Sequence, residues 1–204
     1  MVIFFVAFMT FLRPNELNNI EEQNGFSNSD QLEEQITLLK DSLRLAGNPE
    51  KRANFATRLS VNYDLASKPD SAAQFQEYAA KELPNEETLF EAGRKFFNAF
   101  SVSNDPIEGQ ILAGKSEKYL NLLLKLDSTH VEGNVLLGVL YLITERTTEG
   151  VDILRKVVEI NPNHQEANFN LGVHALQAGA FQQASENFER IILQDSDNVQ
   201  VTFY

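Results

Sequence analysis

Apolar residues recur at helical spacing along most of the chain, and one stretch of this pattern occurs twice. The dipeptide Leu137-Gly138 returns as Leu171-Gly172, 34 residues later, and residues 131–134 and 165–168 open the two copies in a matching way. A period of this length with helix-like apolar spacing is typical of stacked helical hairpins. The pattern therefore predicts an all-α fold, an α-solenoid of antiparallel helix pairs. Such arrays generally bind other proteins and carry out no chemistry.

An N-terminal helix that precedes the array is predicted over residues 30–48. Asp30 is a suitable N-cap, and the Gly-Asn-Pro sequence at residues 47–49 would end the helix. One face of this helix carries its apolar residues, Leu32, Ile36, Leu39 and Leu43. That spacing also suits a coiled-coil seam, although two heptads are too few to define one. We expect the helix to pack on the first hairpin, with a dimerisation seam as the alternative.

From Ala53 onward the chain resembles the tetratricopeptide repeat family. That family has a Leu-Gly pair and an aromatic residue on the first helix of each unit, small and aromatic residues on the second, and a proline after it. The resemblance implies four units at about residues 53–85, 86–130, 131–164 and 165–198, with residues 199–204 as the start of a truncated further repeat. The matching residues are Leu59, Ser60, Tyr63, Ala72, Ala79 and Pro84; Ala92, Gly93 and Phe96; Leu137, Gly138, Tyr141, Leu154 and Pro162; and Leu171, Gly172, Ala184 and Phe188.

The chain also departs from the family's pattern. The second unit is eleven residues longer than the 34-residue period. Asn134 and Asn168 replace a large residue on the first helix of the third and fourth units, and Gly150 and Val157 replace alanines. Ser196 replaces the proline of the fourth unit.

Small residues are expected where the helices of a pair cross closely. Gly138 and Gly172 lack side chains on the first helices, and Gly150 and Ala184 supply small partners on the second helices. Residues 144–147 and 177–180 are short enough to join antiparallel helices.

In the family, the first helix of each hairpin lines a concave groove that holds a partner. The resemblance implies a partner-binding groove formed by Phe90, Arg94, Phe97, Glu132, Val135, Leu136, Val139, Leu142, Ile143, Glu166, Phe169, Asn170, Val173, Leu176 and Gln177. The apolar side chains at 139, 142 and 143 favour a partner helix or an extended peptide. The alternative is that neighbouring elements of the chain already cover them. The family's carboxylate clamp is not supported, because its residue types do not occur at the matching positions.

Charge narrows the choice of partner. The 204-residue chain has a formal net charge of −12 and no cysteine. This charge argues against a nucleic-acid partner and against docking on anionic lipid, since both carry negative charge. Basic or neutral proteins fit better. Without cysteine there are no disulfides and no thiolate nucleophiles or metal ligands.

One motif suggests a different function. Residues 109–116, Gly-Gln-Ile-Leu-Ala-Gly-Lys-Ser, match the phosphate-binding pattern letter for letter, with Lys115 and Ser116 as the ligands of phosphate and Mg²⁺. The mechanism needs a strand before the loop, whereas residues 103–108 indicate a turn and a helix start. We expect a helix segment here, with a P-loop nucleotide hydrolase as the alternative.

No other pattern indicates catalysis. His130 and His164 fall in turns between units, and His174 lies on a predicted helix, which favours structural roles for all three. We therefore expect no enzyme activity, no catalytic residue, no metal site, no cofactor and no small-molecule substrate.

The N-terminus is the most apolar part of the chain. Residues 1–12 are almost entirely apolar, and residues 13–29 form a polar linker. A twelve-residue helix would be roughly 18 Å long, short of a ~30 Å bilayer core. We expect a short or truncated membrane anchor, with a signal remnant or a buried start of the fold as alternatives.

These observations predict a membrane-tethered adaptor that binds a protein or peptide partner and resembles bacterial tetratricopeptide proteins with an N-terminal anchor and a periplasmic array. A specialised assembly factor, similar to the repeat domains of cytochrome c maturation or outer-membrane assembly, is a further alternative. This inference depends on similarity of fold.

Overall fold

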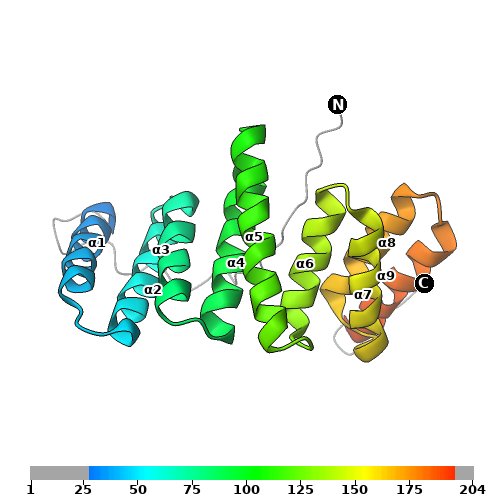
Figure 1. The fold of residues 1–204 in the computed structure, drawn as a ribbon. Coiled ribbons are helices and arrows are strands. Elements are labelled where there is room, and N and C mark those ends of the chain that lie inside the picture. Colours follow the sequence, from blue (N-terminus) through cyan, green and yellow to red (C-terminus); the bar gives the residue numbers. More distant parts are fainter. Residues whose placement is uncertain (1–27, 196–204) are drawn as a thin grey trace.

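The computed structural model describes residues 28–195, and all regular structure within that range is helical (Figure 1). The helices are α1 (Asn28–Leu45), α2 (Pro49–Leu65), α3 (Pro69–Glu82), α4 (Glu86–Val102), α5 (Pro106–Leu126), α6 (Val131–Ile143), α7 (Thr147–Ile160), α8 (Gln165–Gln177) and α9 (Phe181–Asp195). None of these helices has the length and apolar character needed to cross a membrane. The predicted anchor at residues 1–12, most of the linker and the start of a further repeat at residues 199–204 lie outside the described residues.

The helices pack as consecutive pairs. The strongest contacts join α2 to α3, α4 to α5, α6 to α7 and α8 to α9, and each pair also touches the next. The pairs follow one another along an elongated row (Figure 1). Contacts of α4 with α6 and of α6 with α8 bring the first helices of successive pairs together. The prediction of an all-α solenoid of stacked hairpins is confirmed.

Local sequence sets where the helices begin. Asn48 accepts a hydrogen bond from the Lys51 amide at 2.8 Å, and Asn85 and Thr88 form a reciprocal capping box. Pro106 opens α5 after its N-cap Asp105, as the sequence suggested. The first pair starts at Pro49, earlier than the unit boundary expected at residue 53.

The apolar face of α1 packs against the first hairpin of the same chain. Ile36 and Leu39 are buried in one cluster with Leu59 and Tyr63 of α2. This packing matches the expectation that the helix docks on the first hairpin, and it occupies the residues that a dimerisation seam would need.

The close crossings occur where small residues were expected. A Cβ atom on Gly138 would lie 2.8 Å from the Leu154 side chain and 3.3 Å from the Gly150 carbonyl oxygen. A Cβ atom on Gly172 would lie 2.8 Å from the Phe188 ring, and Ala184 is buried. Glycine at these positions therefore permits the helix separation that the pairs adopt.

The second pair is longer than its neighbour. The helices α4 and α5 have 17 and 21 residues, whereas α6 and α7 have 13 and 14. The loop end of the α4–α5 hairpin consequently projects beyond the rest of the array (Figure 1). The additional residues of the second unit thus extend both helices and leave the stacking of the pairs intact.

Candidate functional site

The first helices α4, α6 and α8 carry all of the residues predicted to bind a partner. We call the side of these helices that bears them the first-helix face. Direct contacts between α4 and α6 and between α6 and α8 make this face continuous across three pairs.

Four of the predicted residues lie beneath the surface. Phe97, Val135, Leu136 and Val139 are between 1% and 8% exposed and belong to one core cluster with residues of α5 and α7. Neighbouring elements therefore cover Val139, as the alternative interpretation supposed. These four side chains support the first-helix face from inside and are not part of its open surface.

The other predicted residues reach the surface. Phe169, Leu176 and Ile143 are 48%, 47% and 39% exposed, which is unusual for large apolar side chains next to a core. The remaining ones are half-buried or exposed polar and apolar residues, namely Phe90, Arg94, Leu142, Asn170 and Val173 (half-buried) and Glu132, Glu166 and Gln177 (exposed). Arg94 is engaged by Glu91 on the same helix.

Two carboxylates on this face influence each other. Glu132 and Glu166 take equivalent positions at the starts of α6 and α8. Partial removal from bulk water raises the pKa of Glu166, His164 opposes this, and the Glu132 carboxylate adds the smallest of the three effects, which again raises the pKa. The first-helix face therefore carries two carboxylates that are close enough to influence each other.

A repeated pair of residues holds the start of α6. The side chain of His130 accepts a hydrogen bond from the Gly133 amide at 3.0 Å through Nδ1. The Asn134 side-chain amide donates to the carbonyl oxygens of His130 and Ser128 at 2.9 and 3.1 Å. The histidine thus caps the helix while the asparagine clamps the preceding turn.

The same arrangement recurs at α8. His164 accepts from the Ala167 amide at 3.3 Å, and Asn168 donates to the carbonyl oxygens of His164 and Pro162 at 2.9 and 2.8 Å. Sequence reasoning recorded these asparagines only as departures from the family's pattern. The signal that could have identified them is the shared spacing His-x-Glu-x-Asn, which also places Glu132 and Glu166 in register.

The residues that match a phosphate-binding loop lie inside α5. The Lys115 ammonium contacts Glu77 at 3.1 Å and lies 4.7 Å from the centroid of the Phe96 ring, and Ser116 donates to the Gly93 carbonyl oxygen at 2.9 Å. A regular helix uses its amide groups internally and cannot wrap them around a phosphate. The expectation of a helix segment at residues 109–116 is confirmed, and the nucleotide-binding alternative loses its structural basis.

Polar contacts between pairs link the array. Glu77 of α3 accepts from Lys115 and from the Tyr119 hydroxyl at 3.0 Å, both on α5. Burial raises the pKa of Glu77, but the hydrogen bonds from Lys81, Lys115 and Tyr119 outweigh it and leave the pKa below its ordinary value. The buried Lys95 of α4 pairs with Asp64 of α2, and burial lowers the pKa of this lysine.

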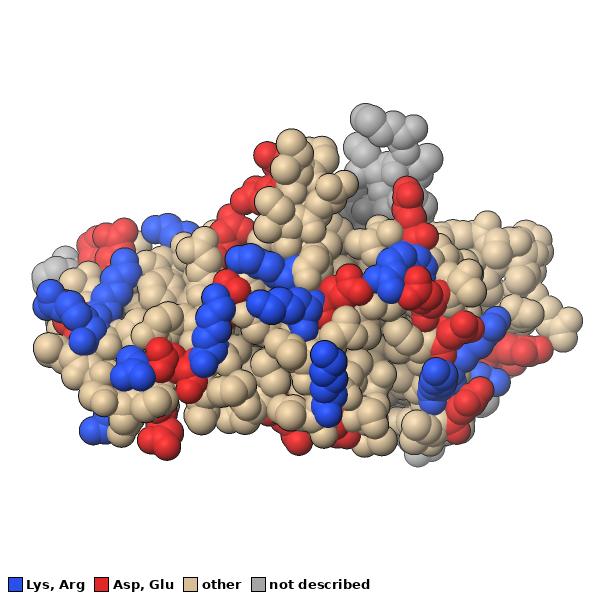
Figure 2. All heavy atoms as spheres, viewed as in Figure 1, with Lys and Arg blue, Asp and Glu red and all other residues tan. Residues whose placement is uncertain are grey.

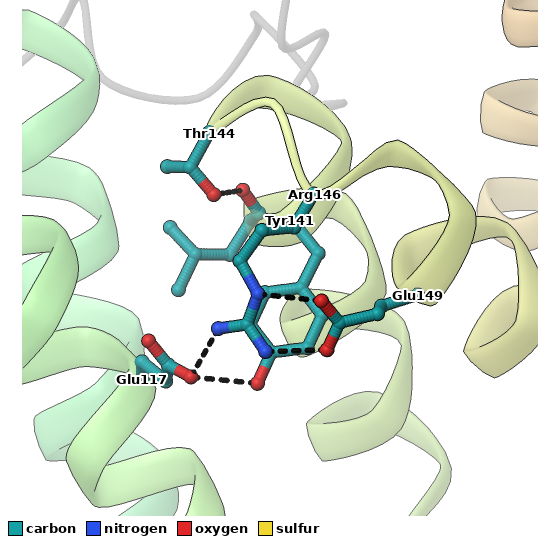
Figure 3. Close-up of polar contacts among 6 residues, drawn as sticks. Glu117, Tyr141, Thr144, Arg146 and Glu149 are labelled. Carbon is teal, nitrogen blue, oxygen red and sulfur yellow. Dashed lines mark hydrogen bonds and ion pairs between the residues drawn. The ribbon is translucent and has the colours of Figure 1, made fainter.

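A second linkage joins α5 to the α6–α7 hairpin (Figure 3). Glu117 accepts from the Tyr141 hydroxyl at 2.7 Å and from Arg146 at 2.6 Å. The Arg146 guanidinium also binds Glu149 and lies 3.7 Å from the centroid of the Tyr141 ring. Burial and the adjacent Glu117 carboxylate raise the pKa of Tyr141. These contacts fix the orientation of the third pair relative to the second.

Comparison with known proteins finds a family match over part of the chain and similar folds among solved structures. Residues 141–201 match the family model described as "Tetratricopeptide repeat". A crystal structure of MamA is similar with a TM-score of 0.64 at 14% identity, covering 84% of this chain and 96% of that chain. A double mutant of MamA RS-1 is similar with a TM-score of 0.66 at 16% identity, covering 82% of this chain and 87% of that chain. MamA from residue 41 to its end, from Desulfovibrio magneticus RS-1, is similar with a TM-score of 0.58 at 15% identity, covering 83% of this chain and 98% of that chain.

No curated protein matches the sequence. At these identities the likeness to MamA establishes the shared fold. Residues 141–201 are therefore recognised by sequence as tetratricopeptide repeat, and the helix pairs that precede them share the stacked-pair fold of the MamA structures.

Proposed function

We propose that this protein is a non-enzymatic adaptor that holds a basic segment of a partner protein on its first-helix face. The observation that carries the proposal is the pair of exposed carboxylates Glu132 and Glu166, with the exposed Phe169 three residues after Glu166 on α8. A lysine or arginine side chain placed between the two carboxylates would relieve their mutual repulsion. Phe169 and Leu176 would add apolar contact area to a helix or extended peptide.

The charge of the whole chain supports a basic partner. A net charge of −12 attracts cationic proteins over a distance and speeds their association at low ionic strength. Because this attraction is screened by salt, binding on the first-helix face should weaken as salt concentration rises.

Site-specific photocrosslinking tests this proposal. A photoreactive phenylalanine analogue at position 169 is expected to capture a partner in the native host, whereas the same analogue at the exposed Leu45 of α1 captures none. The double change Glu132→Gln and Glu166→Gln should lower the yield about tenfold, the effect of losing one or two charge-assisted contacts. Glu34→Gln with Glu159→Gln is the matched control on other exposed surface. Equal capture at positions 169 and 45, or an unchanged yield in the double variant, would contradict the proposal.

The same contact should depend on pH. Binding a cation requires ionised carboxylates, and the pKa of Glu166 lies above its ordinary value of 4.5. The partner is therefore expected to dissociate as pH falls through this raised pKa. In Glu166→Gln that part of the pH dependence should disappear, and crosslinking yield across a pH series measures the difference.

We also propose that the apolar residues 1–12 tether the array to a membrane, with the repeats outside the cytoplasm. Support comes from the sequence, in which this stretch is followed by a polar linker. The full chain is expected to float with phosphatidylcholine vesicles in a density gradient, while a variant without residues 1–12 stays in the dense fraction. Equal flotation of both chains would remove the basis for a tether. Neutral vesicles are used so that the charge of the array does not influence the outcome.

A further inference from the structure

The projecting end of the α4–α5 hairpin carries large apolar side chains that are exposed and not buried in the core of the array. Val102, Ile107 and Ile111 are 60%, 72% and 57% exposed. We call residues 102–111 the tip. Figure 2 shows the projecting region as a mostly uncharged surface bordered on one side by acidic residues. Clustered exposure of large aliphatic side chains marks an interaction surface more often than isolated exposure does.

A cleft of about 620 Å³ lies alongside the tip, between α5 and the α6–α7 turn, and tip residues 103–106, 109 and 110 form part of its lining. It exists because α4 and α5 extend past the ends of α6 and α7. Its lining includes apolar surface at Gly114 and Ile143, three carboxylates (Asp105, Glu117 and Glu145) and one guanidinium, that of Arg146. Arg146 is already engaged by Glu117 and Glu149, so the lining keeps an excess of negative charge.

We propose that the tip and this cleft form a second interaction surface that takes an amphipathic, basic segment of a different protein. Apolar residues of that segment lie against Val102, Ile107 and Ile111. A lysine or arginine runs its aliphatic stem past Gly114 and brings its charged end to the carboxylates of the cleft. The cleft itself is lined by apolar side chains (Phe100, Ala113, Leu140 and Ile143) as well as by carboxylates, which matches the apolar stem and the charged end of such a side chain.

The negative charge of the chain favours a basic segment of another protein over a second copy of this chain and over anionic lipid. Two copies of a chain with net charge −12 repel each other, which disfavours self-association through the tip. Anionic lipid is disfavoured for the same reason. The surface is also distinct from the first-helix face, although Ile143 lies at the border of both and is left unchanged in the test.

The test uses the full chain and a fluorescein-labelled amphipathic peptide of leucine and lysine, with a leucine–glutamate peptide of equal length as the negative control. Fluorescence anisotropy measures the Kd at fixed salt. Gly114→Trp should fill the cleft, and a Cβ at this position has no other atom within 4 Å, so the added side chain leaves the backbone without a clash. Gly114→Ala is its control. Ile107→Ser with Ile111→Ser removes the apolar contact, and Leu45→Ser with Ile160→Ser changes residues of similar exposure elsewhere.

We expect Gly114→Trp and the tip double variant each to raise the Kd at least about tenfold, as loss of a central contact does. The two controls should leave it unchanged, and the pair Glu132→Gln with Glu166→Gln, which reports on binding to the first-helix face, should raise it less than the tip variants do. Absence of saturable binding, or equal Kd values in all variants, would overturn the proposal. So would loss only in the first-helix variant, since the peptide would then occupy that face. Sedimentation showing self-association that Gly114→Trp abolishes would identify a second copy as the occupant and reject this proposal as well.

Discussion

Gly150→Ala should destabilise the fold by about 1–3 kcal/mol, the usual cost of overpacking. A Cβ atom at this position would lie 2.6 Å from the Gly138 carbonyl oxygen and 2.9 Å from the Leu142 amide nitrogen. Both neighbours are backbone atoms of α6, so relief requires the two helices to move apart. Helix propensity alone predicts the opposite sign, because alanine is favoured over glycine by about 1 kcal/mol in a helix. Urea denaturation of the full chain measures the difference.

The identical substitution at Gly114 is the control. Gly114 lies inside α5, and a Cβ there has nothing within 4 Å. Gly114→Ala should therefore raise the free energy of unfolding by about 0.5–1 kcal/mol through helix propensity. If both variants shift stability in the same direction, the close crossing of α6 and α7 does not limit the residue at position 150.

Leu154→Ala is expected to cost about 2–5 kcal/mol, the range measured for emptying a buried leucine site. Leu154 is fully buried on α7 and belongs to the largest core cluster, where its side chain fills the space opposite Gly138. Gly138 carries no side chain that could move into the cavity. Leu45→Ala, at a site that is 78% exposed, should change stability by less than about 0.5 kcal/mol.

The helices that lose stability in the Leu154→Ala variant can also be predicted. Units of a repeat array contact only their neighbours, so local damage spreads mainly to adjacent pairs. Hydrogen exchange of Leu154→Ala should show the greatest loss of protection in α6 and α7, a smaller loss in α5 and α8, and little change in α1 and α2. Uniform loss along the array would show instead that the chain unfolds as a single cooperative unit.

Much of this architecture could be predicted because its signals are local. The recurrence of Leu137-Gly138 as Leu171-Gly172 located two hairpins, and Pro106 indicated the start of α5. The false phosphate-binding motif was also interpreted correctly from its surroundings, since a turn and a helix start precede it. In each case neighbours in sequence determine the backbone conformation.

The candidate surface was harder to predict. Val139 and Phe169 both lie on first helices and both were expected to meet a partner, yet Val139 is 6% exposed and Phe169 is 48% exposed. Val139 belongs to a core cluster that includes residues of α5 and α7, whereas Phe169 lies outside that cluster, and no repeat pattern specifies these contacts between helices. The link between Glu117 and Arg146 was likewise unforeseen, because the two residues lie on different pairs.

The order and pairing of the helices follow from short-range periodicity, since a hairpin with one apolar stripe can bury it only against its neighbours. The amino-acid pattern was therefore sufficient for the solenoid and for the repeat match at residues 141–201. Exposure of individual side chains, the acidic pair at Glu132 and Glu166 and the cleft below the tip arise from contacts between residues far apart in the chain. Those features depend on interhelical distances and angles, and only the packed array specifies them.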